Sequence, residues 1–111
     1  MAIVNAQLTT TQLDILTVPA DKSYAITNIL VCNTSSTDAA SFDLHFIPNG
    51  DALANKVTRV VNELSLPAGE TFTFDSERIV LEAGDKVAFV AEPDIGSSLT
   101  DLAATVSYLE V

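Results

Sequence analysis

Residues 41–46 read Ser-Phe-Asp-Leu-His-Phe, and they indicate the fold class because large apolar side chains alternate in them with polar ones. Successive side chains of an extended chain point to opposite faces, so Phe42, Leu44 and Phe46 share one face. Alternation of this kind predicts a strand with one buried side and one wet side. His45 is expected on the wet side, exposed to solvent or paired with a carboxylate.

The same period-two pattern recurs along the chain in stretches rich in β-branched and aromatic residues. The expected strands cover residues 3–9, 13–18, 24–33, 40–47, 57–66, 70–75, 78–82, 85–92 and 102–110. Eight or nine short strands in 111 residues predict an all-β chain, a single antiparallel β-sandwich of the jelly-roll or immunoglobulin-like type. Residues 1–111 are interpreted as one domain, with residues 1–12 forming an N-terminal arm or an edge strand.

Residues 51–64 allow two interpretations. Leu53, Val57, Val60 and Leu64 fit the apolar stripe of a helix. The β-branched residues among them lose side-chain freedom in a helix, which favours a strand. We expect a helical turn near residues 51–55 followed by a strand, and a longer helix is the alternative.

Three corners share one sequence pattern: an apolar residue, Pro or Glu, Ala, Gly or Asp, and then a charged residue. They lie at residues 18–22, 66–70 and 81–85. Gly69 and Gly84 can take a positive φ without a steric penalty. A proline near the start of two of these corners fixes the bend. Each corner is expected to turn the chain into a new strand.

The charge balance narrows the class of partner. Fifteen acidic residues against five basic ones give a net charge of −10. Such a field repels phosphate backbones and anionic lipid, so neither nucleic acid nor a membrane is an expected partner. No apolar run approaches the ~18 residues of a membrane-spanning helix, and residues 1–5 lack the features of a signal peptide. The single cysteine, Cys32, is expected to be a buried, unreactive thiol, as suits folding in a reducing cytoplasm.

No group of reactive side chains stands out, so neither an enzymatic activity nor a cofactor is expected. His45 is the only histidine, and no serine lies in a nucleophile-elbow context. One histidine and one cysteine are too few for a zinc site. Carboxylate pairs such as Glu92 with Asp94 occur without an aromatic sugar platform. The acidic loop at residues 92–101 could hold a hard cation, but solvated acids are the simpler interpretation and no metal site is assigned.

Residues 24–33 are apolar on both faces of the expected strand, with Ile26, Leu30 and Cys32 on one face and Ile29 and Val31 on the other. The outer face of a sandwich strand normally meets water. Ile29 and Val31, together with Val90 and Leu109, are therefore candidates for a subunit interface. The alternative is that the N-terminal arm or a loop covers them.

Four pieces of the chain carry a family resemblance. They are residues 24–35, a strand that ends in Asn; residues 66–72, a Leu-Pro-Ala-Gly-Glu corner; residues 79–87, with Ile-Val-Leu-Glu-Ala-Gly-Asp; and residues 104–111, with Val-Ser-Tyr-Leu-Glu. Together they resemble small β-sandwich virion proteins of tailed bacteriophages, the head decoration or cement proteins and related tail accessory proteins. The resemblance extends over residues 24–111 and is one of general sequence pattern. It assigns no functional residues to this chain.

The resemblance implies a non-enzymatic structural protein of the virion, made in the host cytoplasm. It implies a homo-oligomer, with a trimer favoured, that docks on the major capsid protein or on another virion protein. The leading expectation is a capsid decoration subunit that staples the assembled head, and the alternative is a tail, baseplate or fibre-attachment protein. A carbohydrate- or receptor-binding module would need exposed aromatic side chains, for which Tyr24 and Tyr108 are the candidates.

Overall fold

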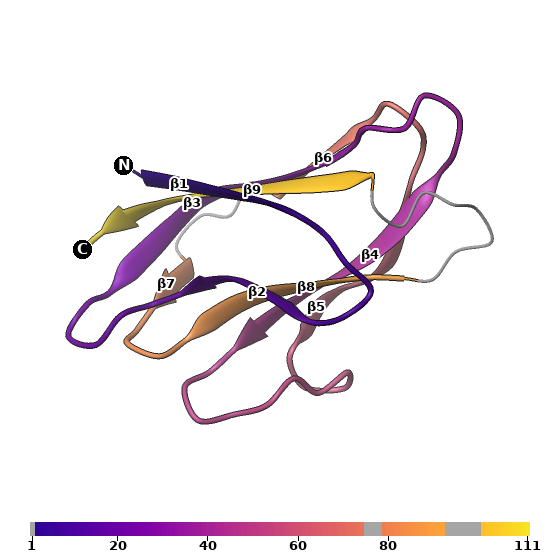
Figure 1. Ribbon diagram of the computed structural model, residues 1–111. Coiled ribbons are helices and arrows are strands. Elements are labelled where there is room, and N and C mark those ends of the chain that lie inside the picture. The colour runs from indigo at the N-terminus through magenta and orange to yellow at the C-terminus, as the bar shows by residue number, and fades with distance from the viewer. Residues whose placement is uncertain (1, 75–78, 93–100) are drawn as a thin grey trace.

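A computed structural model describes residues 2–74, 79–92 and 101–111, which form nine β-strands and no helix (Figure 1). The strands are β1 (Ala2–Gln7), β2 (Leu13–Thr17), β3 (Tyr24–Asn33), β4 (Ala40–Ile47), β5 (Arg59–Leu66), β6 (Thr71–Phe74), β7 (Ile79–Leu81), β8 (Lys86–Ala91) and β9 (Leu102–Glu110). Their ends fall within two residues of the ranges expected from alternation.

The strands form two antiparallel sheets packed face to face (Figure 1). One sheet has the order β1-β9-β3-β6, with β7 also paired to β3, and the other has the order β2-β8-β4-β5. The first strand pairs with the last, β2 with β8, β3 with β6 and β7, and β4 with β5. A long hairpin rolled up in this way is a jelly roll. The all-β sandwich is thus confirmed, and of the two types left open the strand pairing is that of the jelly roll.

The N-terminal residues form an edge strand. β1 pairs with β9 in one unbroken register, from Ala2 opposite Tyr108 to Gln7 opposite Ala103. Leu8 follows directly and is fully buried in the core between the sheets. Of the two alternatives for this segment, arm or edge strand, the structure shows the edge strand.

The three corners with a shared sequence pattern all carry the chain from one sheet to the other, between β2 and β3, β5 and β6, and β7 and β8. In each, the fourth residue has a positive φ: 64° at Asp21, 77° at Gly69 and 85° at Gly84. The first and third corners also bond to each other. The N–H of Gly84 donates to the carbonyl of Val18 at 2.9 Å, and the N–H of Val18 donates to the carbonyl of Asp85 at 3.0 Å.

Asn33, at the end of β3, anchors the second corner. Its buried side-chain amide donates to the carbonyls of Leu66 at 2.9 Å and Asp38 at 2.8 Å, and its Oδ1 accepts from the N–H of Ser35 at 3.0 Å. Its backbone carbonyl accepts from the N–H of Gly69 at 3.1 Å. Because every polar atom of this buried side chain is bonded, Asn33 stabilises the corner rather than weakening the core.

The core lies between the sheets, where Phe42 and Phe89 are fully buried. A register shift between Ile26 and Asn28, opposite β9, places one extra residue in β3. A bulge of this kind reverses the alternation, so Ile26 and Ile29 face the same side although they are three positions apart. The sequence assigned these two residues to opposite faces, and that assignment was wrong for this reason.

Residues 51–64 contain a short turn followed by a strand. The N–H groups of Val57 and Thr58 both donate to the carbonyl of Ala54, at 3.0 and 2.8 Å, which makes a single helical turn. β5 then begins at Arg59. The favoured interpretation is confirmed with the turn lying three residues later than expected, and the longer helix is wrong.

Candidate functional site

The four residues predicted to form an interface do not share a surface. Ile29 and Val31 are fully buried in the core, so their assignment to an outward face was wrong, and the bulge in β3 is the cause. Val90 is half-buried on the outer face of the four-stranded sheet, where its register partner is Asp43. Leu109 is 40% exposed on the outer face of the five-stranded sheet. Of the four, only Leu109 is exposed on the outer face of the five-stranded sheet.

The outer face of the five-stranded sheet carries no charged side chain over the described residues of its strands. Alternation, burial and register place on it Ile3, Asn5, Gln7, Ala25, Thr27, Asn28, Leu30, Cys32, Thr71, Thr73, Val80, Ala103, Thr105, Ser107 and Leu109. We call this surface the neutral face. Small polar and apolar side chains make it up, in a chain where 20 of 111 residues are charged. Cys32 belongs to it and is half-buried, not fully buried as expected.

The neutral face can be recognised in the sequence from stretches without charged residues, which alternation alone does not reveal. Residues 1–13, 23–37 and 102–109 contain no charged residue. These three stretches supply β1, β3 and β9, which the fold makes immediate neighbours in the order β1-β9-β3. Charge-free segments far apart in the sequence are thus gathered on one side of the molecule.

The most exposed apolar side chains of the neutral face lie toward the N-terminal end of β3. Ala25 pairs with Leu109 of β9 on one side and with Val80 of β7 on the other. Val80 is 50% exposed and Leu109 is 40% exposed. Ile3 of the neighbouring strand β1 is 64% exposed. Exposed apolar side chains without charges among them are typical of the centre of a protein–protein interface.

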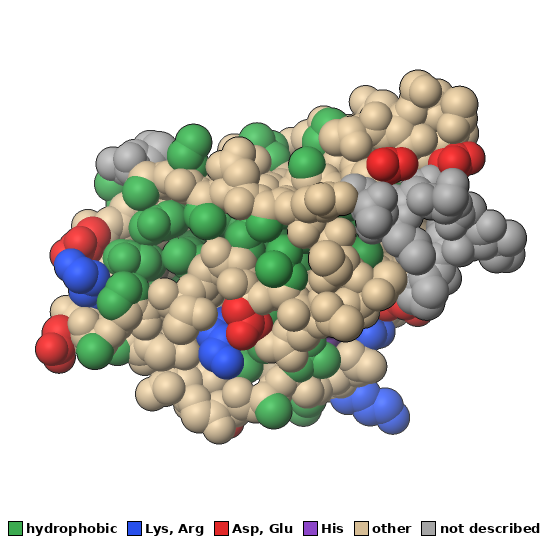
Figure 2. All heavy atoms as spheres, viewed as in Figure 1, with side chains coloured by type: hydrophobic (Ala, Val, Ile, Leu, Met, Phe, Trp, Pro, Cys, Tyr) green, Lys and Arg blue, Asp and Glu red, His purple; other side chains and the backbone are tan. Residues whose placement is uncertain are grey.

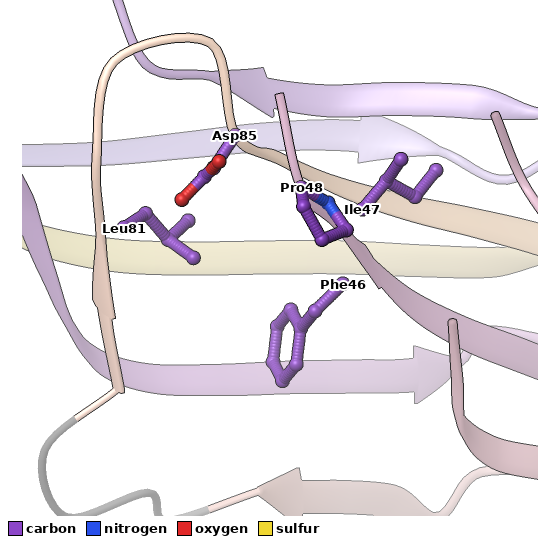
Figure 3. Close-up of a pocket in the computed structure, with 5 residues that line it drawn as sticks. All are labelled: Phe46, Ile47, Pro48, Leu81 and Asp85. Carbon is purple, nitrogen blue, oxygen red and sulfur yellow. The ribbon is translucent and has the colours of Figure 1, made fainter. Parts of the chain in front are cut away.

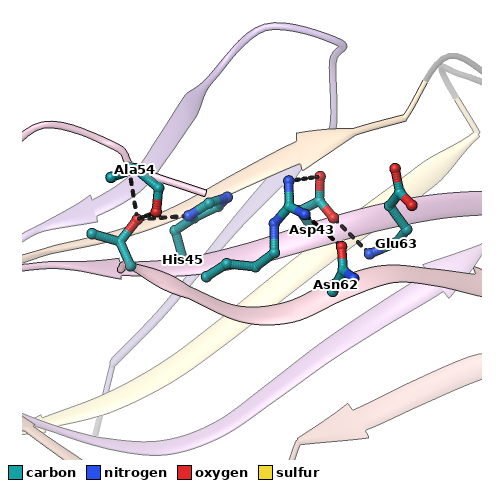
Figure 4. A network of polar contacts seen from close by, with 7 residues as sticks. Asp43, His45, Ala54, Asn62 and Glu63 are labelled. Atoms are coloured by element: carbon teal, nitrogen blue, oxygen red, sulfur yellow. Dashed lines mark hydrogen bonds and ion pairs between the residues drawn. The ribbon is translucent and has the colours of Figure 1, made fainter. Parts of the chain in front are cut away.

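The outer face of the four-stranded sheet is different, because it holds a compact polar cluster around Asp43 (Figure 4). Asp43 is 1% exposed, and its carboxylate accepts the backbone N–H of Glu63 at 2.6 Å. The Arg59 guanidinium lies 3.5 Å from the other carboxylate oxygen and also donates to the side chain of Asn62. Glu63, which donates this N–H, has a positive φ of 45°. The buried charge of Asp43 is therefore compensated within the cluster.

Glu92, at the end of β8, belongs to the same cluster. A hydrogen bond to the Asp43 carboxyl, with burial and the charge of Asp43 as further causes, raises the pKa of Glu92 to about 7. Protonated Glu92 can donate this hydrogen bond, whereas two ionised carboxyl groups would repel each other. Glu92 is therefore partly protonated near pH 7.

His45 is fully buried, so the expectation that it faces solvent or a carboxylate was wrong. Its Nδ1 lies 2.8 Å from the hydroxyl of Thr58. That hydroxyl donates to the carbonyl of Ala54 at 3.0 Å, so Nδ1–H is the donor to Thr58 in a neutral ring. Burial first, and then the positive charge of Arg59, lower the pKa of His45 and keep the ring neutral. The hydrogen bond between His45 and Thr58 holds the turn at residues 54–58 against β4. Both side chains are buried, so neither is accessible to a substrate.

Figure 3 shows a small hollow of about 80 Å³, with a lining of Phe46, Ile47, Pro48, Leu81 and Asp85. Its volume is well below the ~300–1,000 Å³ of ordinary small-molecule sites. The carboxylate of Asp85 is already occupied, since it accepts the backbone N–H groups of Asn49 at 2.8 Å and Glu82 at 2.9 Å. These two bonds hold the Asp85 carboxylate against the backbone around the hollow.

In the part of the chain that the structure describes, no group of three or more His, Cys, Asp or Glu side chains could hold a metal ion. Most of the acidic loop at residues 92–101 lies outside the described residues. None of the described residues forms a helix that could cross a membrane.

The aromatic side chains do not form a sugar-binding platform. Tyr24 and Tyr108, the two candidates, pack on each other with their ring centroids 4.5 Å apart, and both are half-buried against the core. The five phenylalanines are likewise buried or half-buried. Because glycan recognition needs an exposed ring, the carbohydrate-binding alternative has no support in this surface.

Comparisons of the chain with protein-family models, with curated proteins and with solved structures find no match. The two outer faces of the sandwich differ in their charge. One is charged and internally compensated, and the other is neutral and partly apolar.

Proposed function

We propose that the chain is a non-enzymatic structural protein of a tailed-phage virion, a capsid decoration or cement subunit that binds the assembled head. The observation that carries the proposal is the neutral face, a wide sheet surface without charge on a protein of net charge −10. Wet faces of antiparallel sheets usually carry charged residues, whereas the centres of protein interfaces are depleted of them. The proposed partner is a capsid subunit, which the neutral face contacts.

Three further features support binding over catalysis. The buried Asp43 is bonded to Arg59 and to the N–H of Glu63, His45 is bonded to Thr58, and the hollow beside Asp85 is too small for an ordinary substrate. The jelly roll occurs in viral shell proteins and also in lectins and cupins, so the fold is compatible with the proposal without deciding it. The family resemblance of residues 24–111 agrees with the capsid assignment.

The proposed mechanism is stapling. A subunit that docks across the boundary between neighbouring capsid proteins gains from contacts with both, and the second contact forms at a high effective concentration. The protein should then bind assembled shells much more tightly than free capsid subunits. The acidic residues that the structure describes lie on other surfaces, where they favour solubility.

Electron cryo-microscopy of virions that contain this chain tests the proposal. We expect density for it at many equivalent positions on the head, with the face formed by β1, β9 and β3 against the shell. Density confined to the tail, the baseplate or one vertex would contradict the capsid proposal and support a tail, baseplate or fibre-attachment protein instead. Absence of the chain from purified virions by mass spectrometry would contradict both.

A further inference from the structure

We propose that β1 pairs edge to edge with β1 of a second copy of this chain, antiparallel and about a two-fold axis, so that two five-stranded sheets become one continuous sheet. The proposal concerns the free edge of the sheet, and it holds whether or not the protein belongs to a virion.

The first step is that β1 has unpaired backbone groups along its outer side. The N–H of Leu8 donates to the carbonyl of Leu102 in β9 at 2.9 Å. In an antiparallel ladder the backbone groups of alternate residues point to the same neighbour, so Ala6 and Val4 also face β9. The N–H and C=O groups of Asn5 and Ile3 then point away from β9. Since β1 is the end strand of its sheet in the described chain, these groups face outward.

The second step is that β1 lacks the devices that normally block an edge. Natural edges carry charges, prolines or bulges, or they are very short. β1 has the sequence Ala-Ile-Val-Asn-Ala-Gln, with no charge and no proline, and its register with β9 is unbroken. An edge of this kind recruits another strand.

The third step is that the other edge strands are protected, so β1 finds its best match in a copy of itself. β2 is interrupted by a register shift and carries Asp14, which pairs with Lys86 at 3.7 Å. β5 has two register irregularities and carries Arg59 and Glu63. β6 and β7 have only four and three residues. Pairing of β1 with one of these edges on the next copy would be short or irregular.

The fourth step is electrostatic. Two chains of net charge −10 repel each other wherever their acids meet. In the view of Figure 2 the surface over β1 is uncharged and partly hydrophobic, and the charged side chains lie toward the ends of the molecule and over the lower sheet. The β1 edge is therefore a place where two copies can approach without bringing carboxylates together. A two-fold axis near Val4 would set Ile3 of each copy beside Asn5 of the other.

Light scattering coupled to gel filtration, over a dilution series of the untagged protein, tests the proposal. We expect a dimer of twice the 11.7 kDa chain mass that dissociates on dilution. Asn5→Pro removes an outward N–H and leaves the bonds to β9, so it should give a monomer with an unchanged circular dichroism spectrum. Asn5→Ala keeps that N–H and should stay dimeric. Ile3→Lys adds a charge beside the edge and should also give a monomer, which tests the same contact without a proline.

Three results would overturn the proposal. The first is a wild-type protein that stays monomeric at the highest concentration of the series. The second is a trimer, the state that the family resemblance implies, because a two-fold contact cannot produce it. The third is a dimer that survives both Asn5→Pro and Ile3→Lys.

Discussion

Leu109 and Val80 flank the same residue, Ala25, from opposite sides of β3, on the outer face of the five-stranded sheet. Neither has a charged register neighbour there, although the chain carries 15 acidic residues. The two side chains are about half exposed, while Ile29 and Val31 of the same central strand are fully buried. This division between the faces of β3 leads to the first prediction.

Replacing Ile29 by Ala should destabilise the protein far more than replacing Ile3 by Ala. Ile29 is fully buried, and truncating a buried isoleucine lowers the free energy of unfolding by about 2–5 kcal/mol. Ile3 is 64% exposed, and a surface change of this kind stays within about 0.5 kcal/mol. Urea unfolding of both variants measures the difference. Similar losses for the two would contradict the bulge in β3 and return Ile29 to the outer face.

Replacing Glu92 by Gln should remove a pH-dependent loss of stability. The folded chain keeps the proton of Glu92 up to about pH 7, whereas the unfolded chain loses it near its ordinary pKa of 4.5. Between these values the folded state binds more protons, so the free energy of unfolding falls as the pH rises. Glutamine does not titrate, so the stability of the variant relative to wild type should rise from pH 4.5 to pH 7 and then stay constant.

Urea unfolding of both proteins across this pH range makes the measurement. The lowered pKa of His45 acts in the opposite direction below its usual 6.5, because there the unfolded chain binds the proton first. That contribution is present in both proteins and cancels in their difference. A difference that does not change with pH would show that Glu92 does not share a proton with Asp43.

Replacing Gly84 by Ala should cost more stability than replacing Gly69 by Ala. Both glycines have a positive φ, and an L-residue in that conformation costs roughly 1–2 kcal/mol. A Cβ at Gly69 would meet nothing, but one at Gly84 would overlap the side chain of Asn49. Thermal unfolding of the pair gives the comparison, and an equal loss for both would show that Asn49 moves away without a penalty.

The strands and corners could be predicted from the sequence because each depends on local chemistry. Alternation around Phe42 and Leu44 shows which residues are extended, and Gly69 and Gly84 mark turns that need a positive φ. The face assignment of Ile29 could not be predicted, because a one-residue bulge in β3 reverses the alternation and nothing in the local sequence announces it.

The polar cluster was missed for a different reason. Asp43 and His45 alternate with apolar residues as exposed side chains do, yet both are buried. They are covered because Arg59, Glu63 and Thr58, more than ten residues away in the sequence, bond to them across β4 and β5. Alternation concerns one strand at a time. It therefore cannot show that side chains from a distant segment bury a residue of that strand.

Co-sedimentation with assembled shells that lack this chain tests the claim that the neutral face binds another protein of the particle. Val80→Lys places a charge in the neutral face, while Val57→Lys makes the same change at an 80% exposed position in the turn before β5. We predict that Val80→Lys weakens binding about tenfold or more, corresponding to ~1.4 kcal/mol or more, and that Val57→Lys binds as the wild type does. Undiminished binding by the folded Val80→Lys variant would contradict the claim.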